Sequence, residues 1–200
     1  MHISYNCRCI FLAYYSFSLI TEMEERQHKT YNQIALSLTQ VAGITEGLYR
    51  AKINITRLSI VTKNDELADY KKRISGYEKM MDDNAALYEK GLFSDEGRAL
   101  FKEYLKAKSE LSNELQVYYK KVENQDADLQ NYLLKTLENK IQAVQKSCDK
   151  MKESKVKFGD QFMEETDKAS SEGVTMLLVI VAAITILLIV IGIVLNRMTS

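Results

Sequence analysis

The residues best suited to binding chemistry are two arginines and an asparagine in the first third of the chain. Arg50, Asn54 and Arg57 lie at positions i, i+4 and i+7, so on a helix their side chains leave one flank beside the apolar seam. A guanidinium group binds a carboxylate through two parallel hydrogen bonds, which suits it to an organic acid. The pattern predicts a ligand-binding flank at a subunit interface. The same arginines would also be ordinary surface groups if they paired with acids such as Glu46.

Motifs for catalysis are absent from the sequence. It has no glycine-rich phosphate loop, no His-Glu-x-x-His zinc motif and no serine in a nucleophile elbow. His2 and His28 lie outside the apolar seams. Cys7 and Cys9 lack the second ligand pair that a zinc site needs, so these residues and Cys148 are predicted to be free thiols. We therefore predict that the chain is not an enzyme and uses no metal or cofactor.

Composition limits both the partners and the fold. The 200 residues carry 27 acidic and 27 basic side chains, and no basic stripe is interleaved with aromatic residues, so nucleic acid is not an expected partner. The chain has no proline and only eight glycines. Proline interrupts helices and glycine weakens them, so this composition is typical of long uninterrupted helices. An all-α fold is predicted.

Apolar residues recur at alternating steps of three and four through most of the chain, which is the pattern of amphipathic helices. Four helices are predicted, at about residues 22–62, 65–90, 95–122 and 126–172, and together they form one domain, 22–172. Short connections require neighbouring helices to be antiparallel, so the prediction is an up-down four-helix bundle. The first seam contains Val41, Ile44, Leu48, Ala51, Ile55, Leu58 and Thr62.

Local signals mark the connections between these helices. Gly91 follows Lys90 at the predicted end of the second helix, where glycine is typical of a left-handed C-terminal cap. Ser94 is suited to the N-cap of the third helix. In the fourth helix, Lys155 interrupts an otherwise apolar seam, and Gly159 weakens it. No stop signal follows, so this helix is predicted to continue into the apolar segment beyond it.

That apolar segment is predicted to be a transmembrane helix. Residues 173–196 contain no charged side chain, and the part from Val174 to Leu195 would be about 33 Å long as a helix. A bilayer hydrocarbon core is about 30 Å thick. Membrane lipid is therefore an expected partner. The flanking charges of Lys168 and Arg197 nearly balance, so they do not predict which side the bundle occupies.

A second, shorter apolar stretch lies near the N-terminus. Between Arg8 and Glu22 there are 13 uncharged residues, which is short for a membrane span. The stretch fits the remnant of a first transmembrane helix, a signal-like segment, or an artefact of where the reading frame was started. We assign residues 1–21 to a degenerate or truncated first transmembrane segment.

Together these features resemble the four-helix-bundle sensor domain of bacterial methyl-accepting chemotaxis receptors and related sensor kinases. The resemblance covers about residues 34–200. It rests on a fourth helix fused to the span and on three patterns: ITEGLYRAKINITRLSIVT, KNDELADYKKRISGYEKMMDD and FSDEGRALFKEYLKA. The final residues NRMTS are similar to the start of the linker that opens a HAMP module, which we place at 197–200.

The resemblance implies a receptor of the bacterial inner membrane with a cytoplasmic N-terminus and an extracytoplasmic bundle that forms a homodimer. Family ligands are small molecules, often organic or amino acids, and arginines of the first helix commonly contact them. Arg50 and Arg57 match these positions, with Asn54 between them. HAMP and methyl-accepting output regions would follow Ser200, and we expect this chain to lack them. The leading hypothesis is a sensing bundle that passes ligand binding to the membrane through a displacement of the fourth helix.

The alternative is a tail-anchored helical interaction protein whose bundle lies in the cytosol. It is suggested by the position of the predicted span, four residues before the last residue of the sequence. Lys155 and Gly159 argue against it, because they interrupt the continuous apolar stripe that a partner helix would need.

Overall fold

The computed structural model describes residues 14, 17, 18, 20–22, 24, 25, 28, 31–61 and 64–199. Most of the predicted first transmembrane segment, residues 1–21, lies outside the described residues, as does Ser200. The chain divides into two compact units. One contains residues 29–159, and the other contains residues 160–200 together with residues 1–28.

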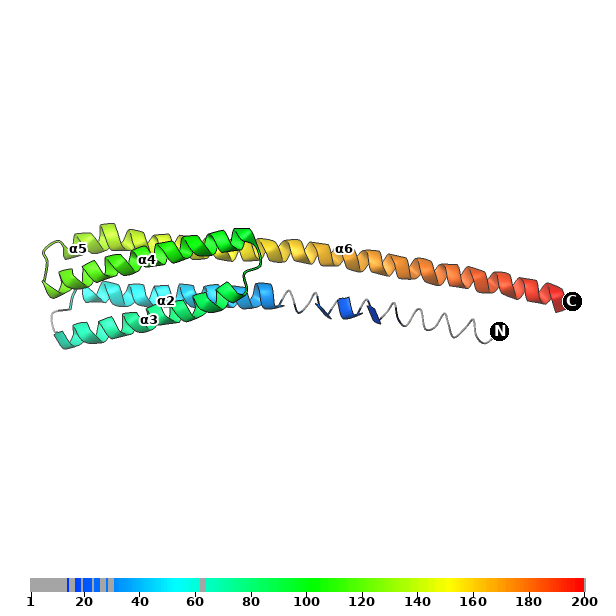
Figure 1. Ribbon diagram of the computed structural model, residues 1–200, viewed down its shortest axis with the longest axis horizontal. Coiled ribbons are helices and arrows are strands. Elements are labelled where there is room, and N and C mark those ends of the chain that lie inside the picture. The colour runs from blue at the N-terminus through cyan, green and yellow to red at the C-terminus, as the bar shows by residue number, and fades with distance from the viewer. Residues whose placement is uncertain are drawn as a thin grey trace. The chain divides into compact units, whose positions relative to one another are not determined.

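The unit of residues 29–159 is a bundle of antiparallel helices (Figure 1). A single π-helical turn, η1 (Tyr31–Ala35), leads into α2 (Leu36–Leu58), which is followed by α3 (Asn64–Lys90) and α4 (Asp95–Glu123). The fourth helical segment begins with α5 (Leu129–Tyr132) and the π-helical η2 (Leu133–Leu137), and continues as α6 (Glu138–Thr199). The described residues contain no strand. The predicted all-α, up-down four-helix bundle is thereby confirmed.

Two helix boundaries differ from the predicted ones. The first helix was expected to reach Thr62, but α2 ends at Leu58, where a tighter turn begins with the Ser59 N–H donating to the Thr56 carbonyl at 3.2 Å. The fourth helix was expected from residue 126 and instead begins at Leu129. Before it, Gln125 has a φ of 52°, so the turn places one non-glycine residue in the left-handed region.

The bundle core is apolar and draws on all four helical segments. Every described residue of the predicted first seam is buried, so the seam is confirmed from Val41 to Leu58, while Thr62 lies outside the described residues. Tyrosines contribute large side chains, and three of them are fully buried: Tyr88, Tyr104 and Tyr118. The core residues of α4 and of the fourth segment are Phe101, Tyr104, Leu111, Leu115, Tyr118, Val122, Leu133, Leu137, Ile141, Val144, Cys148 and Met151.

The connection between α3 and α4 is built differently from the prediction. Gly91 is not in the left-handed region, so the predicted cap geometry is wrong. Instead its N–H donates to the Tyr88 carbonyl at 3.0 Å, and a Cβ at this position would lie 3.2 Å from Ser37 Oγ on α2. A side chain with a Cβ would therefore make a tight contact with α2, and glycine avoids it. Ser94 is the N-cap of α4 as predicted, since its hydroxyl oxygen accepts the Gly97 N–H at 3.0 Å.

Close packing between α2 and α3 depends on Gly47. A Cβ on Gly47 would lie 2.7 Å from Met81 Cγ and 3.1 Å from the Tyr77 carbonyl oxygen, which is backbone and cannot swing away. Gly76, on α3, has nothing within 4 Å of the same position. The two glycines are therefore a matched pair, one at a helix contact and one in open space.

We expect Gly47→Ala to lower the free energy of unfolding by about 1–3 kcal/mol, because overpacking outweighs the gain in helix propensity. Gly76→Ala should raise it by up to about 1 kcal/mol, since alanine is the better helix former and meets no neighbour. Thermal unfolding followed by circular dichroism measures both changes. A higher melting temperature for Gly47→Ala would contradict the close approach of α2 and α3.

The second unit contains α6 from Asp160 onward. The helix continues without interruption through Phe162 and Val174 to Thr199, so the prediction that the fourth helix runs into the apolar segment is confirmed. Among the described residues, this is the one helix long enough and apolar enough to cross a membrane, and none of its most apolar window is buried. An apolar helix in a soluble core would instead be covered by neighbours.

Candidate functional site

The two predicted arginines lie on the outer surface of α2. Arg50 is exposed and forms an ion pair with Glu46, one helical turn earlier, at 2.6 Å. Its hydrogen bond to Glu46 raises the pKa of Arg50 above the ordinary value. Arg57 is also exposed. Both guanidinium groups are therefore accessible to a ligand from solution, and Arg50 has a carboxylate already beside it.

Asn54 lies differently from its two neighbours. It is buried, with 6% of its surface exposed, and its side-chain amide donates to the Arg50 carbonyl at 2.7 Å. Its Oδ1 is buried without a hydrogen-bond partner in the described part of the chain. The three residues thus do not present a single row of donors to solvent. The arginines face outward, while the asparagine amide is used within its own helix.

An exposed apolar stripe lies beside the arginines on α2. Ala42, Tyr49 and Ile53 are exposed, and their spacing of seven and four residues places them on one face of the helix. The Tyr49 side chain is 58% exposed and that of Ile53 46%. Large apolar side chains grouped on a helix face are typical of a contact surface. We call these three residues the α2 outer stripe.

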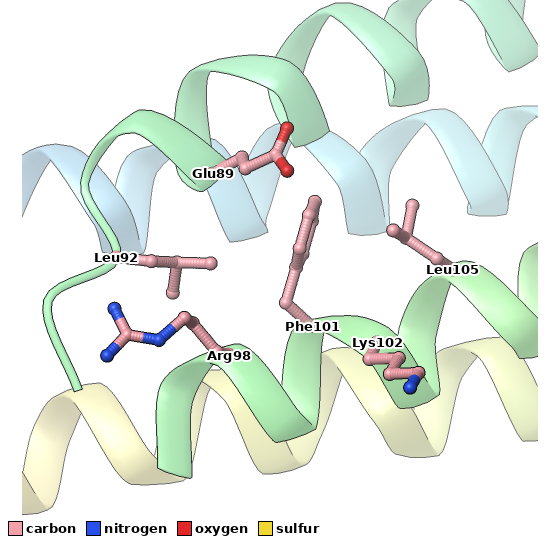
Figure 2. Close-up of a pocket in the computed structure, with 6 residues that line it drawn as sticks. All are labelled: Glu89, Leu92, Arg98, Phe101, Lys102 and Leu105. Atoms are coloured by element: carbon pink, nitrogen blue, oxygen red, sulfur yellow. The ribbon is translucent and has the colours of Figure 1, made fainter. Parts of the chain in front are cut away.

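A separate hollow of about 300 Å³ lies between the end of α3 and the start of α4. Figure 2 shows Glu89 extending from the last turn of α3, Leu92 on the connecting loop, and the other lining residues on α4. The wall contains three apolar side chains, and the rim contains three charged ones. The six lining residues are Glu89, Leu92, Arg98, Phe101, Lys102 and Leu105.

The three charged residues around this hollow differ in whether they have an ion-pair partner. Arg98 donates to Asp95 at 2.7 Å, three residues earlier on α4. The side chains of Glu89 and Lys102 form no ion pair or hydrogen bond with any residue that the structure describes. One carboxylate and one ammonium group therefore remain available at the rim.

Behind the wall of the hollow, α6 contributes a buried lysine. Lys155 is only 4% exposed, and its ammonium lies 5.3 Å from the Tyr88 ring centroid and 4.7 Å from that of Phe93. No carboxylate in the described ranges pairs with it. Desolvation lowers the pKa of Lys155. The faces of two aromatic rings are thus its main electrostatic partners.

Sequence reasoning missed this cluster. Lys155 was identified only as an interruption of the seam, whereas the structure uses it to fill the corner where α3 turns into α4. Two buried hydroxyls near this corner, Ser37 Oγ and Tyr88 Oη, have no hydrogen-bond partner among the described residues. The sequence signal that could have pointed to these residues was the lysine at a core position of the fourth helix, Lys155. The residues around it could not be found without the turn geometry.

The side chains that could act as a nucleophile or as metal ligands do not have the surroundings that those roles require. Cys148 lies in the core with no exposed surface, and burial raises the pKa of its thiol to about 12. A nucleophilic cysteine needs the opposite shift, toward the thiolate. No group of three or more His, Cys, Asp or Glu side chains able to hold a metal ion occurs within the described residues.

Comparison with known proteins gives one match. A protein family described as a four helix bundle sensory module for signal transduction matches residues 8–169, which is 162 of the 200 residues. This range includes the whole of the bundle unit, residues 29–159. The search of curated proteins found no match. The matching family is one of signalling modules and not of catalysts.

Proposed function

Because this chain belongs to the family of four-helix-bundle sensory modules for signal transduction, we propose that it is the small-molecule sensing bundle of a chemoreceptor-like transmembrane protein. The family predicted from the sequence is confirmed. Membership, together with a helix able to cross a bilayer, indicates association with a membrane. We also propose the class of ligand, the side of the membrane on which the bundle lies, and the movement that transmits the signal.

The observation that carries the proposal is the continuity of α6. The same helix supplies core residues such as Ile141 and Met151 and then includes the apolar segment at residues 173–196. A continuous helix transmits an axial displacement because its backbone hydrogen bonds resist a local change of length. Shifts of about 1–2 Å are usual for helices at signalling interfaces. Ligand binding would bias α6 between two such positions if its affinity for them differs.

We place the ligand at the arginines of α2. Arg50 and Arg57 are exposed cations seven residues apart, so both lie on the same side of the helix. A carboxylate ligand must displace Glu46 from Arg50. An exposed ion pair between residues one helical turn apart contributes little to stability, so this competition costs little. Small organic or amino acids are the proposed ligands.

A homodimer would complete this site. The α2 outer stripe lies beside the two arginines and exposes large apolar side chains, which favours pairing with the same surface of a second copy. A twofold interface would bring the arginines of both copies to its edge. The ligand would then be bound between subunits, where relative movement of the helices is easiest.

We propose that the bundle lies on the extracytoplasmic side of a bacterial inner membrane. A sensor of external small molecules must be exposed to them there. Protease added to intact spheroplasts should then degrade the bundle while a cytosolic marker protein survives. Protection of the bundle until the membrane is permeabilised would instead favour the tail-anchored alternative.

Binding of small carboxylates tests the ligand site. With the full chain in lipid nanodiscs, calorimetric titration of a panel of small mono- and dicarboxylates should identify a ligand. Arg50→Ala and Arg57→Ala should each weaken its binding by about 10- to 100-fold, because a charge-assisted hydrogen bond is worth about 1.5–3 kcal/mol.

Arg73→Ala is the matched control. Arg73, on α3, pairs with Asp69 at 2.7 Å with nearly the same side-chain exposures as the Arg50–Glu46 pair. Its removal should leave the affinity unchanged. An affinity lowered equally by all three substitutions would reflect a general loss of positive charge, and an affinity lowered by none would remove the α2 arginines from the site.

A further inference from the structure

The hollow between α3 and α4 has the composition of a second binding site. Its walls are apolar, with Leu92 on the loop, the nearly buried Phe101, and Leu105. Its volume of about 300 Å³ would accept a molecule of the size of a single large amino acid. Figure 2 shows Glu89 and Lys102 on opposite sides of the Phe101 ring.

The charged side chains at the rim indicate which charges a ligand of this hollow should carry. Arg98 is neutralised locally by Asp95, with their atoms 2.7 Å apart. Glu89 and Lys102 have no such partner among the described residues. A purely anionic ligand would meet the Glu89 carboxylate, and a purely cationic one would meet the Lys102 ammonium. A ligand carrying one charge of each sign satisfies both.

We propose that this hollow binds a zwitterionic small molecule with an apolar body. Its carboxylate pairs with Lys102, its ammonium pairs with Glu89, and its apolar part covers Leu92 and Phe101. Both charged side chains are long and exposed, so they can reach a common ligand. The proposal shares with the proposed function the idea that the bundle senses small molecules, but it uses none of the α2 residues.

Occupancy of the hollow can be communicated to α6 through direct contacts. The Phe101 ring forms part of the hollow and lies 5.7 Å from the Tyr88 ring. Tyr88 in turn lies under the Lys155 ammonium at 5.3 Å, and Leu92 is the chain neighbour of Phe93, which lies 4.7 Å from the same ammonium. A ligand that displaces Phe101 or Leu92 therefore acts on the rings that hold a buried charge of α6.

Three related probes test the charge requirement on the full chain in nanodiscs. L-leucine carries both charges, 4-methylpentanoate lacks the ammonium group, and isopentylamine lacks the carboxylate. L-leucine, or L-phenylalanine if the hollow prefers an aromatic body, should bind. Each single-charge analogue of leucine should bind about tenfold or more weakly, which corresponds to about 1.4 kcal/mol per lost pair.

Substitutions at the rim identify the site. Glu89→Gln should weaken binding of the amino acid about tenfold or more, but it should not weaken binding of 4-methylpentanoate, which has no ammonium group. Lys102→Gln should likewise weaken binding of the amino acid about tenfold or more, but it should not weaken binding of isopentylamine, which has no carboxylate. Lys106→Gln, an exposed lysine one turn further along α4 that does not line the hollow, is the matched control and should change nothing. All three side chains are on the surface, so folding should be preserved.

Three results would overturn the proposal: no binding of either amino acid, equal binding of leucine and its analogues, or unchanged binding by Glu89→Gln and Lys102→Gln. Arg50→Ala separates this site from the α2 site. If Arg50→Ala abolishes binding of the amino acid while the rim variants do not, the α2 site stands and the hollow is not a ligand site. If the rim variants abolish it while Arg50→Ala does not, the hollow stands by itself.

Discussion

Replacement of Tyr104 by alanine is expected to lower the free energy of unfolding by about 3–5 kcal/mol, the cost of removing a large aromatic side chain from a packed core. Tyr104 has no exposed surface, and its ring lies 6.0 Å from that of Phe101 in a stacked arrangement. The cavity would open next to the wall of the α3–α4 hollow. Urea or thermal unfolding of the full chain in nanodiscs, followed by circular dichroism, measures the loss.

Substitution of Tyr104 by phenylalanine measures the contribution of its hydroxyl to stability separately from that of its ring. Tyr104 Oη is buried and has no hydrogen-bond partner among the described residues, and burial raises the pKa of this phenol. Removing an unsatisfied buried hydroxyl should leave stability unchanged or raise it by about 1 kcal/mol. Tyr118 is the control, since its hydroxyl donates to the Ile55 carbonyl at 3.3 Å and Tyr118→Phe should cost about 1 kcal/mol. Equal losses for both variants would show that the Tyr104 hydroxyl has a partner after all.

Lys155→Met is expected to stabilise the bundle by about 1–3 kcal/mol, because an apolar side chain of similar length avoids the cost of burying an ammonium group without a carboxylate. The rings of Tyr88 and Phe93 recover part of that cost in the native protein, and a thioether also packs well on aromatic rings. Lys155→Glu should instead destabilise by several kcal/mol, since a carboxylate would face the negative faces of both rings. A melting temperature that falls in Lys155→Met would show that the ammonium stabilises the corner.

The stability difference between Lys155→Met and the native chain should depend on pH. The pKa of Lys155 is lowered by desolvation in the folded state, so the unfolded chain binds its proton more tightly. Native stability therefore rises with pH in the window between the lowered folded pKa and the unfolded value of about 10.4. The advantage of methionine should be full at neutral pH and shrink through this alkaline window. Taking the difference between the two proteins cancels the contributions of the other lysines. Tyr88, which contacts Lys155, titrates above this window, because burial raises its pKa to about 12.

A lysine that is predicted to lower the stability of the bundle is most easily understood if the corner where α3 turns into α4 has a task beyond stability. Lys155 connects α6 to the end of α3 and to the α3–α4 loop through Tyr88 and Phe93. A contact of modest strength can be broken and re-formed at small cost. Such a contact suits a helix that is proposed to move by about 1–2 Å during signalling.

The family could be predicted from the resemblance of three sequence patterns to known sensor domains. The all-α fold and the position of the apolar segment followed from periodicity and composition, which act locally along the chain: the apolar residues of the first seam had to be on one side of their helix, and proline was absent throughout. The N-cap at Ser94 was equally local, since its hydroxyl reaches an amide only three residues away.

The details of the candidate sites became visible only once the helices were packed together. Helical spacing placed Asn54 beside Arg50 and Arg57, but it did not reveal that the asparagine amide binds its own helix backbone while the arginines face outward. Nor did it show that Gly91 serves a close approach and not a left-handed turn, or that Lys155 is enclosed by rings from another helix and a loop. Each of these depends on side chains far apart in sequence, and the distance between them is set by how the helices pack, which the pattern of a single helix does not contain.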